Sequence, residues 1–537
     1  MSRAGIVLTP TRPAARAVAG GAPGLETIVT GAGPERARRA AINLSARCRG
    51  APAVAVVTAG PAPAAGPDPL GGPGPEPGDV VVASAVPGPH GPVPVPGASL
   101  LAAALARAGL RVHGPAAAGP WGPGASAGAN GSNGTNGAHG HGPGAGPADA
   151  PGDGDGRAAD RVGFGDPEAD AEAGWLAAAA GDRPLAAVRV VTPPVPPPGG
   201  GTVAPAGLGL AAYRSLRRVG RVLAAWATAV GPRRVLLAEP RSFCAGVERA
   251  IEVVERALDR YGPPVYVRRQ IIHNRHVVAD LEARGAVFVD EVDEAPEGAR
   301  LVFSAHGVAP AVEAAAAARG QTVIDATCPL VAKVHREVRR FARRGYGVVL
   351  VGHAHHDEVE GTMGEDADIR LVSTPADAAA VEVPDPERVA YVTQTTLALD
   401  EVEEVVGVLR DRFPTLVGPS AADICYATQN RQDAVRAIAD ECDLVLVAGS
   451  QNSSNSHRLV EVAGRSGSVA HLVDDERDIE LAWLAGARTV GVTAGASAPP
   501  WVVERLVEAL ASLGPIEVET RAVTAETVRF PLPEAVC

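Results

Sequence analysis

Short apolar segments alternate with longer segments of helical periodicity beyond residue 234, and this alternation constrains the fold more than any other feature of the chain. Apolar runs of this length, separated by helices, are typical of parallel sheets built from strand-helix-strand units. The pattern predicts an α/β fold, and because three cysteine-bearing junctions divide it into comparable parts, it predicts three small lobes around a common centre in this part of the chain. The expected strands are Val235–Ala238, Val265–Val267, Leu301–Phe303, Val323–Asp325, Val348–Val351, Val389–Val392, Leu444–Ala448 and Thr489–Val492.

Three cysteines lie at the starts of expected helices in this part of the chain. Cys244 and Cys328 each follow an apolar strand, and Cys425 is expected to repeat that placement ahead of a helix at 431–442. Ligands of open α/β sheets bind where strands end and helices begin. Three such thiols without a close CxxC pair favour an iron-sulfur centre over a structural zinc site. On the cysteines alone, three buried structural residues remain the better explanation.

The other cysteines carry no such signal. The chain has six cysteines in all, and in a reducing compartment they are expected to be thiols or metal ligands rather than disulfides. Cys442 lies within an expected helix and is interpreted as a packed residue, whereas Cys48 and Cys537 belong to no motif.

Histidines follow several of the expected strands. His273, His306, His353 and His356 each lie near a glycine or a turn, so we expect them to point into the same central space as the cysteines. A single histidine of this kind is usually a hydrogen-bonded packing residue. Several at equivalent strand ends favour a site for an anion or a metal.

Two segments favour phosphate as the anion. The strand Leu444–Ala448 leads into Gly449–Ser456, a run of hydroxyl and amide side chains before a helix, and Gly491–Pro499 is a second turn of the same kind. Free backbone N–H groups and the positive dipole end of a helix suit a phosphate. Simple helix capping is the alternative, but it needs one serine rather than a whole run.

These motifs together resemble one known family. The span from about 234 to 531 is similar to hydroxymethylbutenyl diphosphate reductase, the LytB/IspH family, which ends the non-mevalonate route to isoprenoids. The motifs that carry the resemblance are PRSFCAGVERAI, HNRHVV, FSAHGV, DATCPLVAKVH, GHAHHDEVEGTMG, TQTTL, DICYATQNRQ, GSQNSSNSHRL and GVTAGASAP.

The resemblance implies an enzyme that reductively dehydroxylates (E)-4-hydroxy-3-methylbut-2-enyl diphosphate to isopentenyl and dimethylallyl diphosphate. It implies a [4Fe-4S] cluster on Cys244, Cys328 and Cys425, with the fourth iron open to the substrate hydroxyl, and a ferredoxin or flavodoxin as electron donor. It assigns Glu358 to proton relay. The implied substrate-binding residues are His273, His306, His356, Thr395, Ser453, Ser454, Asn455 and Ser497.

The first 230 residues have a different composition. Most of the 63 glycines and 48 prolines of the chain crowd into them, and a Gly/Ala/Pro/Asn-rich stretch at about 119–156 is expected to be a disordered insertion. Residues 1–230 faintly resemble a nucleoside phosphorylase or nucleosidase, through Thr30–Gly33, Glu172 and the strand after it. A proline run at 193–198 replaces the family's catalytic acid, so we expect a degenerate α/β domain at 1–230 and a reductase domain at 231–537.

Charge and hydropathy limit the partners. A net charge of −12 does not favour nucleic acid, which requires a basic face, and neither a secretory signal nor a membrane span is apparent. We therefore expect a cytoplasmic protein, and the resemblance implies that it binds a small allylic diphosphate. Two alternatives stay open: a non-catalytic iron-sulfur sensor, and a bifunctional nucleosidase plus reductase.

Overall fold

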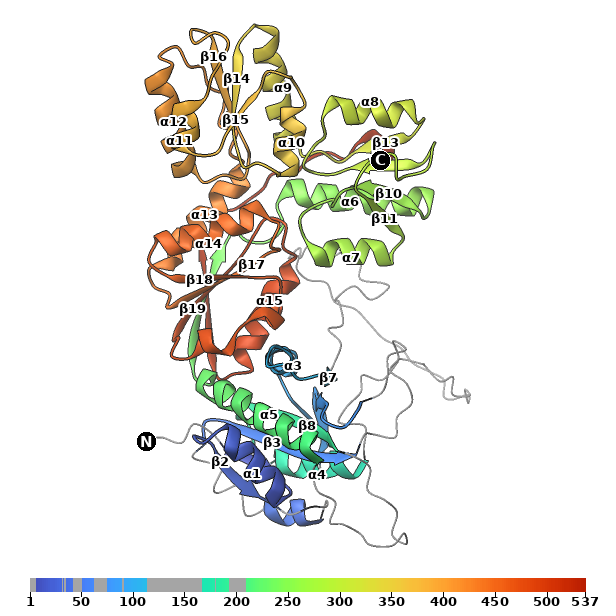
Figure 1. Cartoon of the computed structure of the whole chain (residues 1–537), viewed down its shortest axis with the longest axis vertical. Coiled ribbons are helices and arrows are strands. Elements are labelled where there is room, and N and C mark those ends of the chain that lie inside the picture. The colour runs from blue at the N-terminus through green and yellow to red at the C-terminus, as the bar shows by residue number, and fades with distance from the viewer. Residues whose placement is uncertain are drawn as a thin grey trace, which may run out of the picture.

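The computed structural model of the chain describes residues 6–30, 32, 35–41, 51–61, 75–88, 91–113, 167–178, 180–192 and 209–537. The insertion expected at about 119–156 lies outside these residues, as do Gly31 and Gly33 of the expected phosphate or ribose loop. Three α/β lobes form the larger, C-terminal part, and the N-terminal part lies below the middle one in Figure 1.

The N-terminal part is built on a six-stranded sheet with the order β2-β1-β3-β8-β4-β7. Neighbouring strands are parallel except for the antiparallel pair β4 and β8. A two-stranded hairpin, β5 and β6, accompanies the sheet. The bounds are β1 Ile6–Thr9, α1 Arg12–Gly21, β2 Glu26–Val29, β3 Val54–Pro61, β4 Val80–Val82, β5 Ala85–Gly88, β6 Gly91–Pro94, α3 Ala98–Arg107, β7 Val112–His113, α4 Pro167–Ala178 and β8 Leu185–Thr192.

Both faces of this sheet are covered, because its apolar residues point alternately to either side. In β3, Val54 and Val56 pack on the side of α4, while Ala55 and Val57 pack on the opposite side, with α1 and α3. The α/β character expected for this part of the chain is confirmed for its described residues.

The first lobe of the C-terminal part has a parallel four-stranded sheet with the order β11-β10-β12-β13. Its elements are α6 Ala245–Tyr261, β10 Val265–Arg268, α7 Arg275–Ala283, β11 Ala286–Val289, β12 Arg300–Phe303, α8 Pro310–Ala318 and β13 Thr322–Asp325. The second lobe has a parallel three-stranded sheet, β15-β14-β16. Its elements are α9 Pro329–Arg343, β14 Gly347–Val351, α10 Asp357–Met363, β15 Arg370–Val372, α11 Pro375–Ala380, β16 Val389–Thr393 and α12 Leu399–Arg412.

The third lobe has a parallel five-stranded sheet with the order β18-β17-β19-β9-β20. Its strand β9 comes from the beginning of the C-terminal part, whereas the other four come from its end. The three lobes predicted from the alternating pattern are thus three separate sheets. The elements are β9 Arg233–Glu239, α13 Tyr426–Ala439, β17 Leu444–Ala448, α14 Ser454–Arg465, β18 Val469–Val473, η1 Glu476–Asp478, η2 Leu481–Leu484, β19 Thr489–Ala494, α15 Pro500–Ala511, β20 Ile516–Ala522 and, in the C-terminal tail, η3 Glu534–Val536.

One expected junction is wrong. Cys425 is the N-cap of α13, but no strand ends directly before it. The strand β16 ends at Thr393, and only an isolated bridge between Ala390 and Val417 lies between that strand and the cysteine. The helix also begins at Tyr426, five residues earlier than expected.

Helix α5, Gly209–Ala229, joins the N-terminal part to the third lobe and lies between them in Figure 1. One apolar core runs from the N-terminal sheet through Leu216 and Leu223 of this helix to Leu446 of β17 and Leu506 of α15. A tight crossing between α1 and α5 helps to bring these layers together, since a Cβ on Gly220 would lie 2.4 Å from the carbonyl oxygen of Val18. Both parts of the chain therefore share buried apolar surface, the main source of stability in folding.

Within the described residues, no helix combines the length and the apolar character needed to cross a membrane.

Candidate active site

A cavity of about 110 Å³ opens where the lobes meet, and every residue of the predicted site lines it. The first lobe contributes His273 and His306, the second contributes Glu358, and the third contributes Ser453. The remaining predicted residues on its wall are Cys244, Cys328, His356, Thr395, Cys425, Ser454, Asn455 and Ser497.

The three cysteines share one structural position, because each is the N-cap of a helix: Cys244 of α6, Cys328 of α9 and Cys425 of α13. The helix N-termini therefore direct their positive dipole ends and free N–H groups at the sulfurs. The backbone N–H of Thr428 donates to the Cys425 sulfur at 3.3 Å. These contacts offset part of the cost of burying a thiolate.

Gly246 lies against two of these sulfurs. A Cβ at this position would lie 2.7 Å from the Cys328 sulfur and 3.8 Å from the Cys244 sulfur. The glycine thus leaves open the space between the two thiols that an additional side-chain carbon would fill. This cradle, with three converging thiols, fits a thiolate-bound metal centre.

Burial raises the pKa of each of these thiols, to about 12 for Cys328 and about 11 for Cys425. The thiols repel one another as thiolates, and this repulsion adds to the rise for Cys328 and Cys425. Without a cation the site therefore favours neutral thiols. Binding of a metal would release their protons.

Three histidines pack against one another beside the cysteines. The rings of His273 and His306 are stacked with their centroids 4.0 Å apart, and His356 meets them edge-on at 5.3 and 5.8 Å. Burial is the largest cause that lowers the pKa of each, and charged neighbours lower the pKa values of His306 and His356 further, the latter to about 4. The free site thus holds neutral imidazoles, and an anion among them would favour their protonation.

Glu358 lies deep in the cavity wall, with 2 % of its surface exposed. Its carboxylate accepts from the backbone N–H of Thr395 at 2.7 Å and from the Thr395 hydroxyl at 3.0 Å. Burial raises its pKa to about 7, although these hydrogen bonds act in the opposite direction. A carboxyl group with this pKa can hold or release a proton near neutral pH.

Hydroxyl and amide side chains cover the wall at the start of α14. The hydroxyls of Ser453 and Ser497 lie 3.3 Å apart, and Ser497 also donates to the backbone oxygen of His273 at 3.1 Å. Asn455 is 5 % exposed, yet neither polar atom of its side chain has a hydrogen-bond partner among the described residues. A buried amide without partners costs free energy, so its position on the cavity wall indicates a ligand that bonds to it.

His353 does not belong to this group, contrary to expectation. Its ring pairs with Arg458 and lies 3.4 Å from a carboxylate oxygen of Glu401. It therefore links the second and third lobes outside the cavity.

Sequence reasoning missed Asp357 and Arg269. One carboxylate oxygen of Asp357 lies 4.0 Å from His273 and 3.8 Å from His306, and the other pairs with Arg269. Among the described residues, His273, His306 and Asp357 also each offer a ligand atom within 4.8 Å of the others, a spacing compatible with a metal ion. Asp357 stands between His356 and Glu358, and nothing in the sequence singled it out. Its partner Arg269 lies far away in the sequence, so the pair could not be predicted from a local pattern.

Comparison with known proteins shows which family the chain belongs to. Residues 235–511 match the family model described as LytB protein. The chain belongs to the LytB family. A LytB relative from Bordetella pertussis, named 4-hydroxy-3-methylbut-2-enyl diphosphate reductase, is 57% identical over 301 residues, which are 56% of this chain and 93% of the relative. A Mycobacterium tuberculosis relative, named 4-hydroxy-3-methylbut-2-enyl diphosphate reductase 1, is 58% identical over 313 residues, 57% of this chain and 95% of the relative.

A solved LytB-like structure agrees with this placement. The E-1-hydroxy-2-methyl-but-2-enyl-4-diphosphate reductase from Plasmodium falciparum aligns with a TM-score of 0.55 and 34% identity, over 57% of this chain and 97% of that chain. The LytB match begins inside β9, directly after α5. The resemblance of residues 1–230 to a nucleosidase stays a prediction, and the side chain of Glu172 lies outside the described residues.

Proposed function

We propose that this chain is a 4-hydroxy-3-methylbut-2-enyl diphosphate reductase. The reaction breaks the bond between carbon and the substrate's hydroxyl group and forms a C–H bond at either end of the resulting allyl unit. It consumes two electrons and two protons, and it releases water with isopentenyl or dimethylallyl diphosphate. The observation that carries the proposal is the single cavity in which three helix-capping thiols, three histidines, a buried carboxyl group and an unpartnered amide converge.

Cys244, Cys328 and Cys425 would hold the [4Fe-4S] cluster that the family implies. When bound there, such a cluster supplies electrons one at a time and an iron without a protein ligand. The three helix N-termini would offset the negative charge that thiolates bring to a buried site. An electron donor of the ferredoxin or flavodoxin type fits a centre that accepts single electrons.

The histidine, serine and asparagine side chains of the cavity form a second part of its wall, the diphosphate wall, which would bind the diphosphate. His273, His306, Ser453, Ser497 and Asn455 offer hydrogen-bond donors without a permanently charged side chain. A diphosphate would favour protonation of the buried imidazoles and so recruit positive charge where it binds. Ser454 and the free N–H groups at the start of α14 add donors to the same wall.

Glu358 would hold the proton that leaves with the hydroxyl group as water. Thr395 fixes both oxygens of the carboxyl group, so the proton is held at a defined place in the cavity. His356 accepts from the backbone N–H of Glu358 at 3.2 Å and orients the turn that carries it.

The proposed proton role predicts a pH dependence. Because burial raises the pKa of Glu358 to about 7, the carboxyl group is protonated below that pH and loses its proton above it. We expect kcat to fall as pH rises through neutrality, and the E358Q variant to lack this limb. Steady-state rates of both proteins across the neutral range measure it. A wild-type profile that stays flat there would contradict the assignment.

Asn455 allows the ligand-binding role to be separated from folding. Asn455→Leu keeps a similar shape but removes two polar atoms that have no partner in the free protein. We expect the affinity for substrate to fall by about 10- to 100-fold, the range of a hydrogen bond to a charged group. The free energy of unfolding without ligand should stay the same or rise.

Calorimetric titration and thermal unfolding measure the two effects. Asn430→Leu is the matched control, because the Asn430 amide pairs with Glu526 at 3.0 Å and does not line the cavity. An Asn455→Leu variant with wild-type affinity would remove Asn455 from the proposed site.

Residues 1–230 and 231–537 are proposed as two units, the first a degenerate nucleosidase-like domain and the second the reductase. An anaerobic assay tests the proposed function directly. The full chain, with its cluster and a reduced one-electron donor, should convert the hydroxymethyl diphosphate into the two isoprenoid diphosphates. Full cluster content without turnover would favour the sensor alternative.

A further inference from the structure

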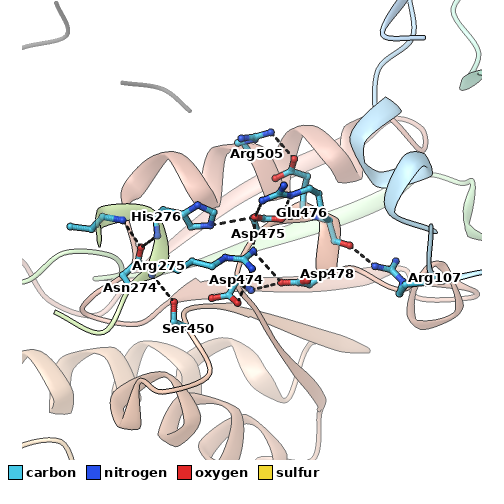
Figure 2. A network of polar contacts seen from close by, with 12 residues as sticks. Arg107, Asn274, Arg275, His276, Ser450, Asp474, Asp475, Glu476, Asp478 and Arg505 are labelled. Atoms are coloured by element: carbon cyan, nitrogen blue, oxygen red, sulfur yellow. Dashed lines mark hydrogen bonds and ion pairs between the residues drawn. The ribbon is translucent and has the colours of Figure 1, made fainter. Parts of the chain in front are cut away.

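The N-terminal part contacts the LytB region at a short turn near the diphosphate wall. Arg107, in the last turn of α3, donates to the backbone oxygens of Arg477 and Ile479, the latter at 2.7 Å. These oxygens belong to η1 and its C-cap, which follow the edge strand β18. Figure 2 shows Arg107 reaching this turn from the N-terminal side.

Asp475, the N-cap of η1, is the centre of the network in Figure 2. It is 1 % exposed, and its carboxylate accepts from the backbone and side chain of Arg477, both at 2.9 Å. It also lies 2.9 Å from Arg275 and 3.3 Å from His276. Burial alone would raise the pKa of Asp475, but the close approach of His276 and hydrogen bonds from Arg477 hold it far below its ordinary value. The carboxylate is therefore a fixed negative charge.

Arg275 and His276 are the first residues of α7, and His273 of the diphosphate wall lies two residues before Arg275. Asn274 caps this helix by accepting from the backbone N–H groups of His276 and Val277 at 3.1 and 3.2 Å. Asp475 thus holds the first turn of α7, and with it the loop that presents His273 to the cavity.

The η1 turn is also anchored to α15 of the third lobe and by a bond within its own segment. Glu476 is paired with Arg505 of α15 at 2.7 Å, and the backbone N–H of Asp474 donates to Asp478 at 2.8 Å. Arg275 also donates from its backbone to Ser450 at 3.3 Å, in the loop between β17 and α14. A displacement of η1 would therefore move the segment before α7 that carries His273, and through Arg275 it would also disturb the loop that carries Ser450.

We propose that the N-terminal part positions the substrate-binding wall of the reductase: Arg107 fixes the η1 turn, and Asp475 of that turn positions the segment that carries His273. The expected effect of this inference on substrate kinetics rests on the proposed function. Arg107 and Asp475 are positioning residues, because neither lines the cavity. The N-terminal part thereby acquires a role that needs no activity of its own.

The Arg107→Ala variant of the full chain tests the proposal. We expect KM for the substrate and Kd for inorganic pyrophosphate to rise by about fivefold, the lower end of typical coupling between sites, with kcat within about twofold of wild type. Hydrogen exchange of the His276 and Val277 amides should accelerate. Arg107→Lys should restore part of the affinity, because an ammonium group still donates to a carbonyl oxygen.

Arg218→Ala is the matched control. Arg218 also donates to a backbone oxygen, that of Gly109 at 3.1 Å, but this contact stays within the N-terminal part. We expect it to leave KM, Kd and exchange in α7 unchanged. Unchanged Kd and exchange in Arg107→Ala would overturn the proposal, and so would a loss of thermal stability with unchanged Kd. Pyrophosphate binding and exchange need no turnover, so failure of the reductase assignment is distinguishable from failure of this inference.

Discussion

Glu358→Gln lowers kcat of the proposed reductase by at least about 100-fold, the lower range of proton transfer by a positioned side chain, while iron per chain stays at the wild-type level. Glutamine has nearly the same shape and can still accept from the Thr395 backbone. It has no acidic proton to give, and the thiols that would hold iron are untouched. Anaerobic steady-state kinetics and iron determination on the same preparations measure the two quantities.

Glu360→Gln is the control for this change. Glu360 lies on the same short helix, but it is largely exposed and pairs with Arg269 at 2.7 Å. We expect it to keep most of the wild-type kcat. A wild-type kcat in Glu358→Gln would remove the carboxyl group from the proton path.

The second large effect is expected from Cys328→Ser. We expect this variant to lose most of its iron, because a serine hydroxyl is a harder and far less acidic ligand than a thiol. The loss of iron affinity should be at least the roughly 10- to 100-fold that removal of an outer-shell partner costs. Iron per chain and the visible absorption of the cluster report it without any need for substrate.

Cys442→Ser is the matched control for this substitution. Cys442 is buried, and its sulfur packs against Gly491 in the third lobe, away from the cavity. We expect iron content to be unchanged in this variant, even where stability falls. Full iron in Cys328→Ser, or an equal loss in Cys442→Ser, would contradict the ligand set.

The apolar alternation predicted every inner strand of the three lobes and the edge strands β13 and β16, but it missed the other edge strands. Every strand expected beyond residue 234 is present, whereas β11, β15, β18 and β20 had not been predicted, and all four lie at sheet edges. Edge strands are partly exposed, and β15, β18 and β20 contain charged residues or a histidine, whereas the wholly apolar β11 is only four residues long. In β20, for example, Val518 is exposed and charged residues flank it.

The residues that line the cavity could be predicted from the sequence, whereas the residues and helix starts that hold them in place could not. Each cysteine, histidine and serine of the predicted set lies beside a strand end or a helix start, positions that local pattern reveals. Asp357 meets Arg269 only through the tertiary fold, and the early start of α13 follows from capping by Cys425 rather than from apolar periodicity.

The link between the N-terminal part and the reductase site also lay beyond the sequence pattern. Helix α5 closes the N-terminal part and also packs against the third lobe, both through one core. The contact of Arg107 with backbone oxygens has no sequence signature, because any residue presents a carbonyl group.

The central claim is that one cavity combines a three-thiolate iron centre with a binding site for the allylic diphosphate. Mössbauer spectra of the anaerobic, iron-57-labelled full chain, recorded with and without substrate, test both parts at once. The account predicts a [4Fe-4S] spectrum in which a single iron changes its signal when substrate is added. A spectrum without such a cluster, or a cluster whose iron signals are all unchanged under saturating substrate, would contradict it.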